Sequence, residues 1–108
     1  MWVKIFTSKD DFLNKVKERS VNKLIINDKH FCITRLDNKI YIHSNECSHE
    51  KANMSNGKLK NNSLECPWHH YQFDLETGNP IDYNNKCNPL KRYLVKEDSS
   101  GIYLQIDN

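Results

Sequence analysis

Two short segments of this chain combine cysteine and histidine at close spacing. The first is Cys47-Ser48-His49, and the second follows after sixteen intervening residues and reads Cys66-Pro67-Trp68-His69. Thiolates and imidazoles bind soft and borderline transition metals in proteins. A Cys-x-His pair and a Cys-x-x-His pair, each within one tight loop, can hold a metal centre from two sides. The candidate ligands are therefore Cys47, His49, Cys66 and His69.

Two kinds of metal centre accept two cysteines and two histidines. Tetrahedral zinc does so, but structural zinc fingers group like ligands together, as a Cys pair followed by a His pair. Here each segment carries one ligand of each type. This arrangement suits a 2Fe-2S cluster in which both thiolates bind one iron and both imidazoles bind the other. The spacing favours such a cluster, and a structural zinc-binding module remains the less favoured alternative.

The rest of the chain is predicted to be mainly short β-strands. Residues Trp2–Phe6 form the first strand, and Ser8 then caps a brief helix with an apolar stripe of Phe12, Leu13 and Val16. Further strands are expected at Leu24–Ile26, Phe31–Leu36, Ile40–His43, around Leu64, and at Tyr71–Phe73, Tyr93–Val95 and Ile102–Ile106. Turn residues Asn27-Asp28 and Asp37-Asn38 separate the early strands into a three-stranded meander.

The chain length of 108 residues leaves room for one domain. Strand patterns occupy residues 1–43 and 83–108, whereas residues 44–82 hold the candidate ligands and fewer apolar side chains. The predicted fold class is therefore all-β. An antiparallel β base built from both ends of the chain carries an inserted subdomain of two loops, with one short N-terminal helix.

The ligand segments resemble the two-loop motif of Rieske iron–sulfur proteins. The run from Cys66 to Gly78, which includes Phe73-Asp74 and Thr77-Gly78, is similar to the second loop of that family and the strand and turn after it. The resemblance covers nearly the whole chain and implies the Rieske fold with one Rieske 2Fe-2S cluster. Cys47 and Cys66 would then bind one iron, and His49 and His69 the other.

Three departures from the family pattern bear on the properties of this chain. The family usually has glycine after the second ligand histidine, where this sequence has His70, whose side chain we expect to point outward. The cytochrome-complex branch has an additional cysteine in each loop, whereas Ala52 and Trp68 stand at the corresponding places here. That branch also has a serine soon after the second ligand histidine. Because hydrogen bonds to the sulfurs and a tied loop pair raise the potential, the soluble, low-potential branch is the better match.

Composition excludes several other classes of protein. A net charge of +2 is too small for a nucleic-acid-binding polycation, and no apolar run is long enough to span a membrane. The N-terminus has no secretory leader, so the four cysteines are expected in the reducing cytoplasm. Cys32 and Cys87 have no partner at ligand spacing and are expected to be packing thiols. We expect a monomer.

The resemblance implies a soluble electron carrier and not an enzyme. It would pass single electrons from a flavin-dependent NAD(P)H reductase to a terminal oxygenase or other oxidoreductase. Replacing two thiolates by neutral imidazoles makes the cluster less negative and raises its potential above that of plant-type ferredoxins. The alternative within the same family is the small Rieske subunit of a nitrite reductase-like complex.

Overall fold

The computed structural model describes residues 1–47, 52–68, 70–81 and 88–106. The elements in order are β1 (Trp2–Phe6), α1 (Lys9–Lys15), β2 (Ser20–Ile26), β3 (Lys29–Leu36), β4 (Lys39–Ser44), the 3-10 turn η1 (Met54–Asn56), β5 (Lys58–Lys60), β6 (Ser63–Glu65), β7 (Gln72–Asp74), β8 (Arg92–Tyr93), β9 (Val95–Asp98) and β10 (Gly101–Gln105). In these ranges no helix is long and apolar enough to cross a membrane. The all-β prediction with one short N-terminal helix is confirmed.

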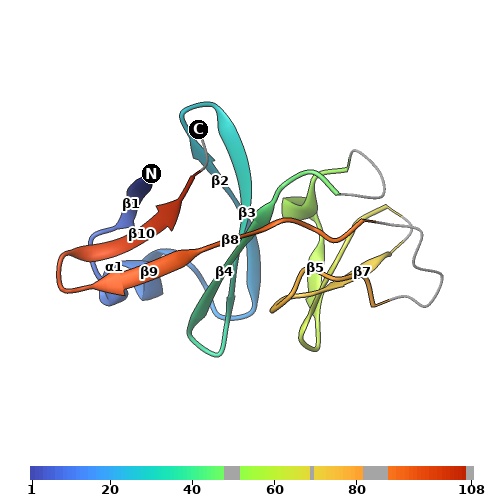
Figure 1. Ribbon diagram of the computed structural model, residues 1–108. Helices are drawn as coiled ribbons and strands as arrows, with labels where there is room; N and C mark the ends of the chain where they lie inside the picture. Colours follow the sequence, from blue (N-terminus) through green and yellow to red (C-terminus); the bar gives the residue numbers. More distant parts are fainter. Residues whose placement is uncertain (48–51, 69, 82–87, 107–108) are drawn as a thin grey trace.

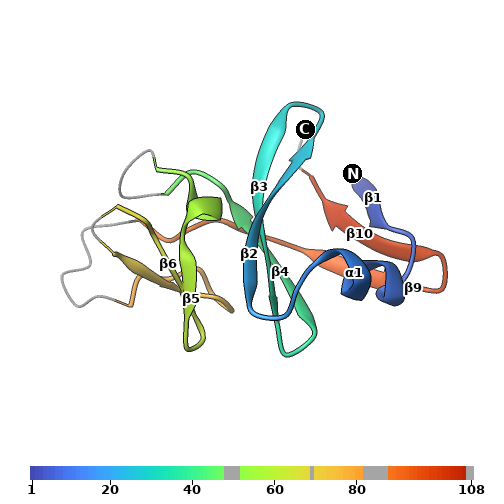
Figure 2. The ribbon, with the colours of Figure 1, turned by 180° about the vertical axis from the view of Figure 1, so that it is seen from behind.

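Three antiparallel sheets follow one another along the molecule. Their strand orders are β1-β10-β9, β2-β3-β4-β8 and β5-β6-β7. Figure 1 shows the β2-β3-β4-β8 sheet in the middle, with α1 and the sheet of the two chain ends on one side and the β5-β6-β7 sheet on the other. The view from behind in Figure 2 has the same arrangement. The segment between β4 and β8 therefore builds a sheet of its own at one end of the molecule.

Local sequence explains how the first strands connect. Asn27 and Asp28 have φ angles of 49° and 66°, and Asp37 and Asn38 have φ angles of 53° and 62°. Two consecutive left-handed residues make the tight turn that matches the twist of a β-hairpin, and Asn and Asp tolerate this conformation better than other non-glycine residues. These turns set the register of β2-β3 and β3-β4, and thereby the direction in which β4 delivers the chain to the first ligand segment.

The central sheet separates two apolar cores. One core is formed against α1 and the terminal strands by side chains that include Phe12, Phe31, Ile33, Ile42, Ile102 and Leu104. The other is formed against the β5-β6-β7 sheet by side chains that include Cys32, Tyr41, Cys47, Met54, Leu64, Cys66, Phe73 and Leu75. Alternation of side chains along β3 and β4 produces this division. The two cysteines of the predicted ligand set thus belong to the second core.

The strand predictions were incomplete at three places, the first being β2, which begins at Ser20 and not at Leu24. The sequence predicts one strand over Tyr93–Val95, but the structure has β8 paired with β4 and β9 paired with β10, so the chain changes sheets at the exposed Leu94. Edge-to-face packing of Tyr93 on Phe31, with ring centroids 5.0 Å apart, holds β8 on the central sheet. Strand β5 was not predicted, because one leucine between two lysines gives too short an alternation.

Candidate metal centre

The first candidate loop, residues 47–52 (loop 1), leaves the end of β4. The Cys47 N–H donates a hydrogen bond of 2.9 Å to the carbonyl oxygen of Ala52. Just outside this bond, Glu46 and Asn53 form an antiparallel bridge. The chain therefore enters and leaves loop 1 as a narrow hairpin with Cys47 at its neck.

The second candidate loop, residues 66–71 (loop 2), has the same closure. The Cys66 N–H donates a hydrogen bond of 2.7 Å to the carbonyl oxygen of Tyr71. Just outside it, Glu65 pairs with Gln72 in the β6-β7 ladder. In both loops the cysteine amide bonds the carbonyl five residues ahead, so both predicted thiolate ligands stand at the first position of a six-residue loop. Figure 1 shows the described flanks of both loops at the end of the molecule away from α1.

The environment of the two thiols fits an iron–sulfur cluster. Cys47 is 3% exposed and Cys66 is 0% exposed, neither forms a disulfide, and both belong to the same core cluster. Met54, Leu64 and Phe73, all fully buried, are members of that cluster as well. Two unbridged thiols at the necks of matching loops, next to an apolar core that excludes water, can serve as ligands to one iron.

The imidazole half of the predicted ligand set lies outside the described residues. His49 and His69 fall within the stretches 48–51 and 69 that the structure leaves undescribed. Over the ranges that are described, no group of three or more His, Cys, Asp or Glu side chains is arranged to hold a metal ion. The structure therefore describes the cysteine half of the predicted ligand set, Cys47 and Cys66.

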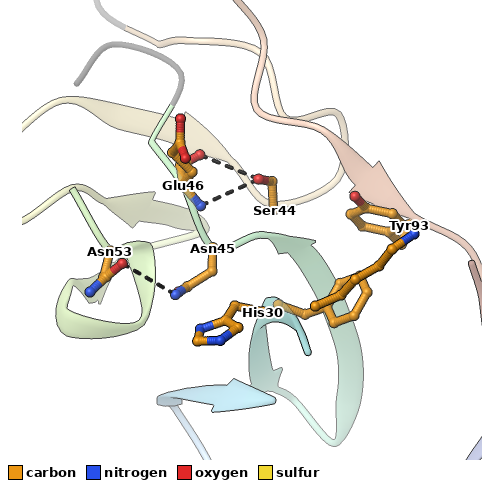
Figure 3. A pocket seen from close by; sticks show the side chains of 8 residues that line it. His30, Ser44, Asn45, Glu46, Asn53 and Tyr93 are labelled. Carbon is orange, nitrogen blue, oxygen red and sulfur yellow. Dashed lines mark hydrogen bonds between the residues drawn. The ribbon is translucent and has the colours of Figure 1, made fainter. Parts of the chain in front are cut away.

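Loop 1 is held at its base by the amide group of Asn45. Asn45 is buried, its carbonyl oxygen accepts a hydrogen bond of 2.6 Å from the Met54 N–H, and its Oδ1 accepts one of 2.9 Å from the Ser55 N–H. Its Nδ2 donates a longer hydrogen bond of 3.5 Å to Asn53 Oδ1 (Figure 3). A neutral residue just before the ligand segment thus ties both strands of loop 1 together.

An open pocket adjoins the same side of loop 1. Its lining includes His30 and Tyr93 together with Ser44, Asn45, Glu46 and Asn53 (Figure 3). The Ser44 hydroxyl donates to the Glu46 carbonyl oxygen at 3.4 Å, and the Glu46 N–H donates to Ser44 Oγ at 3.3 Å. These hydrogen bonds stiffen the two residues that lead into Cys47.

Loop 2 is held by a sheet and by a charged side chain. Its flanking strands β6 and β7 belong to the β5-β6-β7 sheet, and Glu65 at the end of β6 has a buried side chain. The His70 Nδ1–H donates to Glu65 Oε1 at 3.1 Å, and Lys58 Nζ lies 3.9 Å from the same oxygen. The His70 side chain is 73% exposed, which confirms the expectation that it points outward.

A turn after β7 contacts the segment that leads into β8 of the central sheet. Gly78 has a φ of +78°, and a Cβ on it would overlap the carbonyl oxygen of Leu90. The Leu90 N–H in turn donates a 2.7 Å hydrogen bond to the Gly78 carbonyl oxygen. Only glycine accommodates both the left-handed conformation and this close backbone contact. The Thr77-Gly78 pair of the sequence motif therefore has a structural reason.

The remaining cysteines and histidines occupy other surroundings. Cys32 is fully buried, and burial raises the pKa of its thiol to about 12, so it has the inert character expected of a packing thiol. Cys87 lies outside the described residues. His43 is fully buried, with Nε2 donating to the Leu75 carbonyl oxygen at 3.0 Å. Burial lowers the pKa of His43 to about 4, which the bond to Leu75 partly opposes.

Sequence reasoning missed the roles of Asn45, Glu65 and His43. The bond from His43 joins β4 to the segment after β7. The contacts of Asn45 and Glu65 depend on how the chain folds back around each loop. A weak signal existed for Asn45, since an asparagine side chain two residues before a ligand segment can bond the backbone of the loop. No comparable signal marked Glu65, because charged residues at strand ends are usually solvated.

Comparisons with known proteins support the same assignment. Residues 2–94 match the Rieske 2Fe-2S domain family. A ferredoxin component of the naphthalene 1,2-dioxygenase/salicylate 5-hydroxylase systems from Ralstonia sp. is 31% identical over 99 residues, which cover 88% of this chain and 90% of that protein.

Solved structures have the same fold. The ferredoxin of carbazole 1,9a-dioxygenase from Nocardioides aromaticivorans IC177 superposes with a TM-score of 0.78, at 25% identity and covering 96% of each chain. A chain from a complex of reduced oxygenase and oxidised ferredoxin in carbazole 1,9a-dioxygenase gives a TM-score of 0.75 at 22% identity, covering 95% of this chain and 91% of that one.

This chain belongs to the Rieske 2Fe-2S family. The predicted Rieske fold, the 2Fe-2S cofactor and the electron-carrying role of a Rieske ferredoxin are thereby confirmed. The same match favours the 2Fe-2S cluster over the alternative of a structural zinc-binding module.

Proposed function

We propose that this chain is the soluble, cytoplasmic ferredoxin of an oxygenase system. It would accept single electrons from a flavin-dependent NAD(P)H reductase and deliver them to a terminal oxygenase. Support for this pathway comes from the curated relatives, which are named as ferredoxin components of dioxygenase systems. The structural observation that supports it best is the pair of matching loops whose necks hold the buried cysteines Cys47 and Cys66, neither of which forms a disulfide.

The ligand assignment and the division of the chain are part of the proposal. Cys47 and Cys66 would bind one iron, and His49 and His69 the other. The chain would be one domain of residues 1–108, with residues 1–43 and 83–108 as the β base and residues 44–82 as the cluster-binding insertion. When bound, the cluster supplies a one-electron couple. The protein's part is to bury the thiolates, exclude water from them and fix both loop necks.

The proposed carrier has a low potential for its family. The residues of loop 2 after His69 are His70 and Tyr71, so this position offers no serine hydroxyl to a cluster sulfur. Ala52 closes loop 1 by its carbonyl oxygen, and no cysteine at this position can tie the loops together. Protein-film voltammetry near neutral pH should give a midpoint in the lower half of the Rieske range of about −150 to +300 mV. A midpoint above about +100 mV would contradict the assignment to this branch.

Iron and sulfide analysis with electron paramagnetic resonance tests the site. The purified protein should contain two iron atoms and two acid-labile sulfides per chain, and the dithionite-reduced protein should give the spectrum of a Rieske cluster. Cys47→Ser and Cys66→Ser should each abolish that spectrum. Cys32→Ala, which removes the third buried thiol of the described residues, is the matched control and should keep it. Loss of the cluster in Cys32→Ala with retention in Cys47→Ser would refute the ligand assignment.

Copurification separates the free carrier from a fixed subunit. A tagged chain expressed in its native host should elute alone, and the purified protein should then shuttle electrons between separately purified reductase and oxygenase. A large partner in constant stoichiometry would instead identify the nitrite reductase-like subunit.

A further inference from the structure

We propose that the Glu65–His70 pair is a clamp that positions loop 2, the segment carrying Cys66 and His69. The inference rests on the proposed function for the identity of the ligands. It concerns a contact of this chain that the ligand motif does not require, because neither Glu65 nor His70 is one of the four proposed ligands.

The backbone at residue 70 is the first observation. His70 has a φ of 60°, in the left-handed region. Glycine adopts this conformation without penalty, whereas a side chain there costs conformational energy. The structure shows what offsets that cost, since the same backbone conformation aims the His70 Nδ1–H at Glu65 Oε1, 3.1 Å away.

The surroundings of Glu65 are the second observation. Its side chain is 6% exposed, and a buried carboxylate needs a hydrogen-bond donor. Among the described residues His70 supplies a donor at 3.1 Å, whereas Lys58 Nζ is 3.9 Å away on a side chain that is itself 73% exposed. The Glu65 backbone has little freedom to move away, because Gly57 packs so closely that a Cβ there would overlap the Glu65 carbonyl oxygen.

The position of the clamp gives it a specific effect. Glu65 and His70 flank residues 66 to 69, the stretch that begins and ends with the two proposed ligands of this loop. The hydrogen bond from the Cys66 N–H to the Tyr71 carbonyl oxygen also closes this loop, one residue further along the chain at each end than the Glu65–His70 contact. Loop 2 is therefore closed twice, once by the backbone and once by a side chain. Removing the side-chain link should leave the fold intact but let the ligand segment open more often.

Three single variants separate the effect of the Glu65–His70 hydrogen bond from the effect of changing a residue in the left-handed conformation. His70→Gly removes the ring and installs the usual family residue, so it should fold. His70→Asn keeps an N–H donor attached to Cγ, as in the histidine ring, and Asn tolerates the left-handed region. Asn61→Gly is the matched control, because Asn61 has a φ of 54° in the exposed turn between β5 and β6 and lies outside both loops.

The readout is the rate at which a chelator removes iron from the loaded protein. His70→Gly should lose iron about fivefold faster than the wild type, corresponding to one net hydrogen bond of about 1 kcal/mol. His70→Asn should restore most of the difference, and Asn61→Gly should behave as the wild type. A fourth variant, Lys58→Met, removes the more distant cation and should have a smaller effect than His70→Gly. Wild-type iron loss in His70→Gly, or equal acceleration in Asn61→Gly, would overturn the clamp.

Hydrogen exchange of the Cys66 amide in the iron-free protein provides a readout independent of the cluster. His70→Gly should exchange this amide faster than the wild type, and His70→Asn should not. If the wild type binds no cluster, the proposed function fails while this comparison still decides the clamp. If the cluster is present and exchange is equal in all variants, the clamp fails alone.

Discussion

Loop 1 and loop 2 close with the same backbone hydrogen bond but are supported by different chemistry. Below loop 1, the neutral amide of Asn45 bonds the segment that returns from the loop. Below loop 2, a three-stranded sheet carries the flanks, and a buried carboxylate bonds an exposed imidazole. The first support comes from the end of a long strand of the central sheet, and the second from a small sheet of its own.

The two loops share the neck geometry that the cofactor requires, but they differ in the side chains that support each neck. Both thiols stand at the first position of a six-residue loop, so the neck geometry is shared. The side chains that hold each neck follow from the neighbouring structure instead. Loop 1 follows β4, which pairs with β3 on one edge and with β8 on the other. Loop 2 depends instead on contacts within the small β5-β6-β7 sheet and between its own residues. Variants that weaken one support should therefore change the two loops unequally.

His43 connects the two supports, so its protonation should have the largest effect. It lies on β4, which leads to loop 1, and bonds the carbonyl of Leu75, which follows β7. Its pKa is lowered to about 4 in the folded protein, chiefly by burial, against an ordinary value of 6.5. As the pH falls through this window, the unfolded chain takes up a proton that the folded chain refuses. Folding should lose about 3 kcal/mol between pH 6.5 and pH 4.

Chemical denaturation of the iron-free protein at a series of pH values measures this loss. His43→Gln should flatten the part of the curve between pH 6.5 and pH 4. His30→Asn, which removes an exposed histidine of the central sheet, is the matched control. A wild-type curve with no slope in this window would show that His43 is not held neutral by burial.

Gly57→Ala should weaken loop 2 more than loop 1, because the added Cβ would come much closer to the Glu65 carbonyl oxygen than to that of Met54, which it would meet at 3.1 Å. The added Cβ would overlap the Glu65 carbonyl oxygen, which belongs to a backbone paired on both sides in the β5-β6-β7 sheet. Overpacking of this kind costs about 2 kcal/mol. Urea titration should show that loss, and Asn56→Ala at the neighbouring exposed position should not. Equal stability of the two variants would mean that the sheet yields easily at this point.

Asn45→Ala tests the support of loop 1. The substitution leaves the Ser55 N–H without its side-chain acceptor and should destabilise the protein by about 1.5 kcal/mol. Asn45→Asp keeps the acceptor oxygen and should lose less. Amide exchange should accelerate at Ser55 and Cys47 while Cys66 keeps its protection. Faster exchange in both loops together would show that the two supports act as one unit.

The chemistry of the site was predictable because it follows from local spacing. Two Cys/His pairs indicated the cluster, and the Asn27-Asp28 and Asp37-Asn38 turns indicated the meander that leads to loop 1. The supports were not predictable in the same way. The contact between Glu65 and His70 needs the β6-β7 register, and the bond from His43 to Leu75 joins β4 of the base to a residue within the insertion. The sheet change at Leu94 likewise depends on which partner strands are already in place.

Among these variants, Tyr41→Phe should have the smallest effect on the free energy of unfolding. The Tyr41 hydroxyl on β4 donates to Glu76 Oε1 at 2.8 Å, which gives the central sheet a second link to the segment after β7. Burial, followed by the Glu76 carboxylate, raises the pKa of this hydroxyl to about 12, so it stays a donor at every pH used above. Phenylalanine keeps the ring that packs in the core, and the half-exposed Glu76 can turn to water or to Arg92. The free energy of unfolding should therefore fall by about 0.5–1 kcal/mol, with no change in iron retention. A larger loss, or faster iron release than in His70→Gly, would mean that loop 2 depends more on the central sheet than on its own clamp.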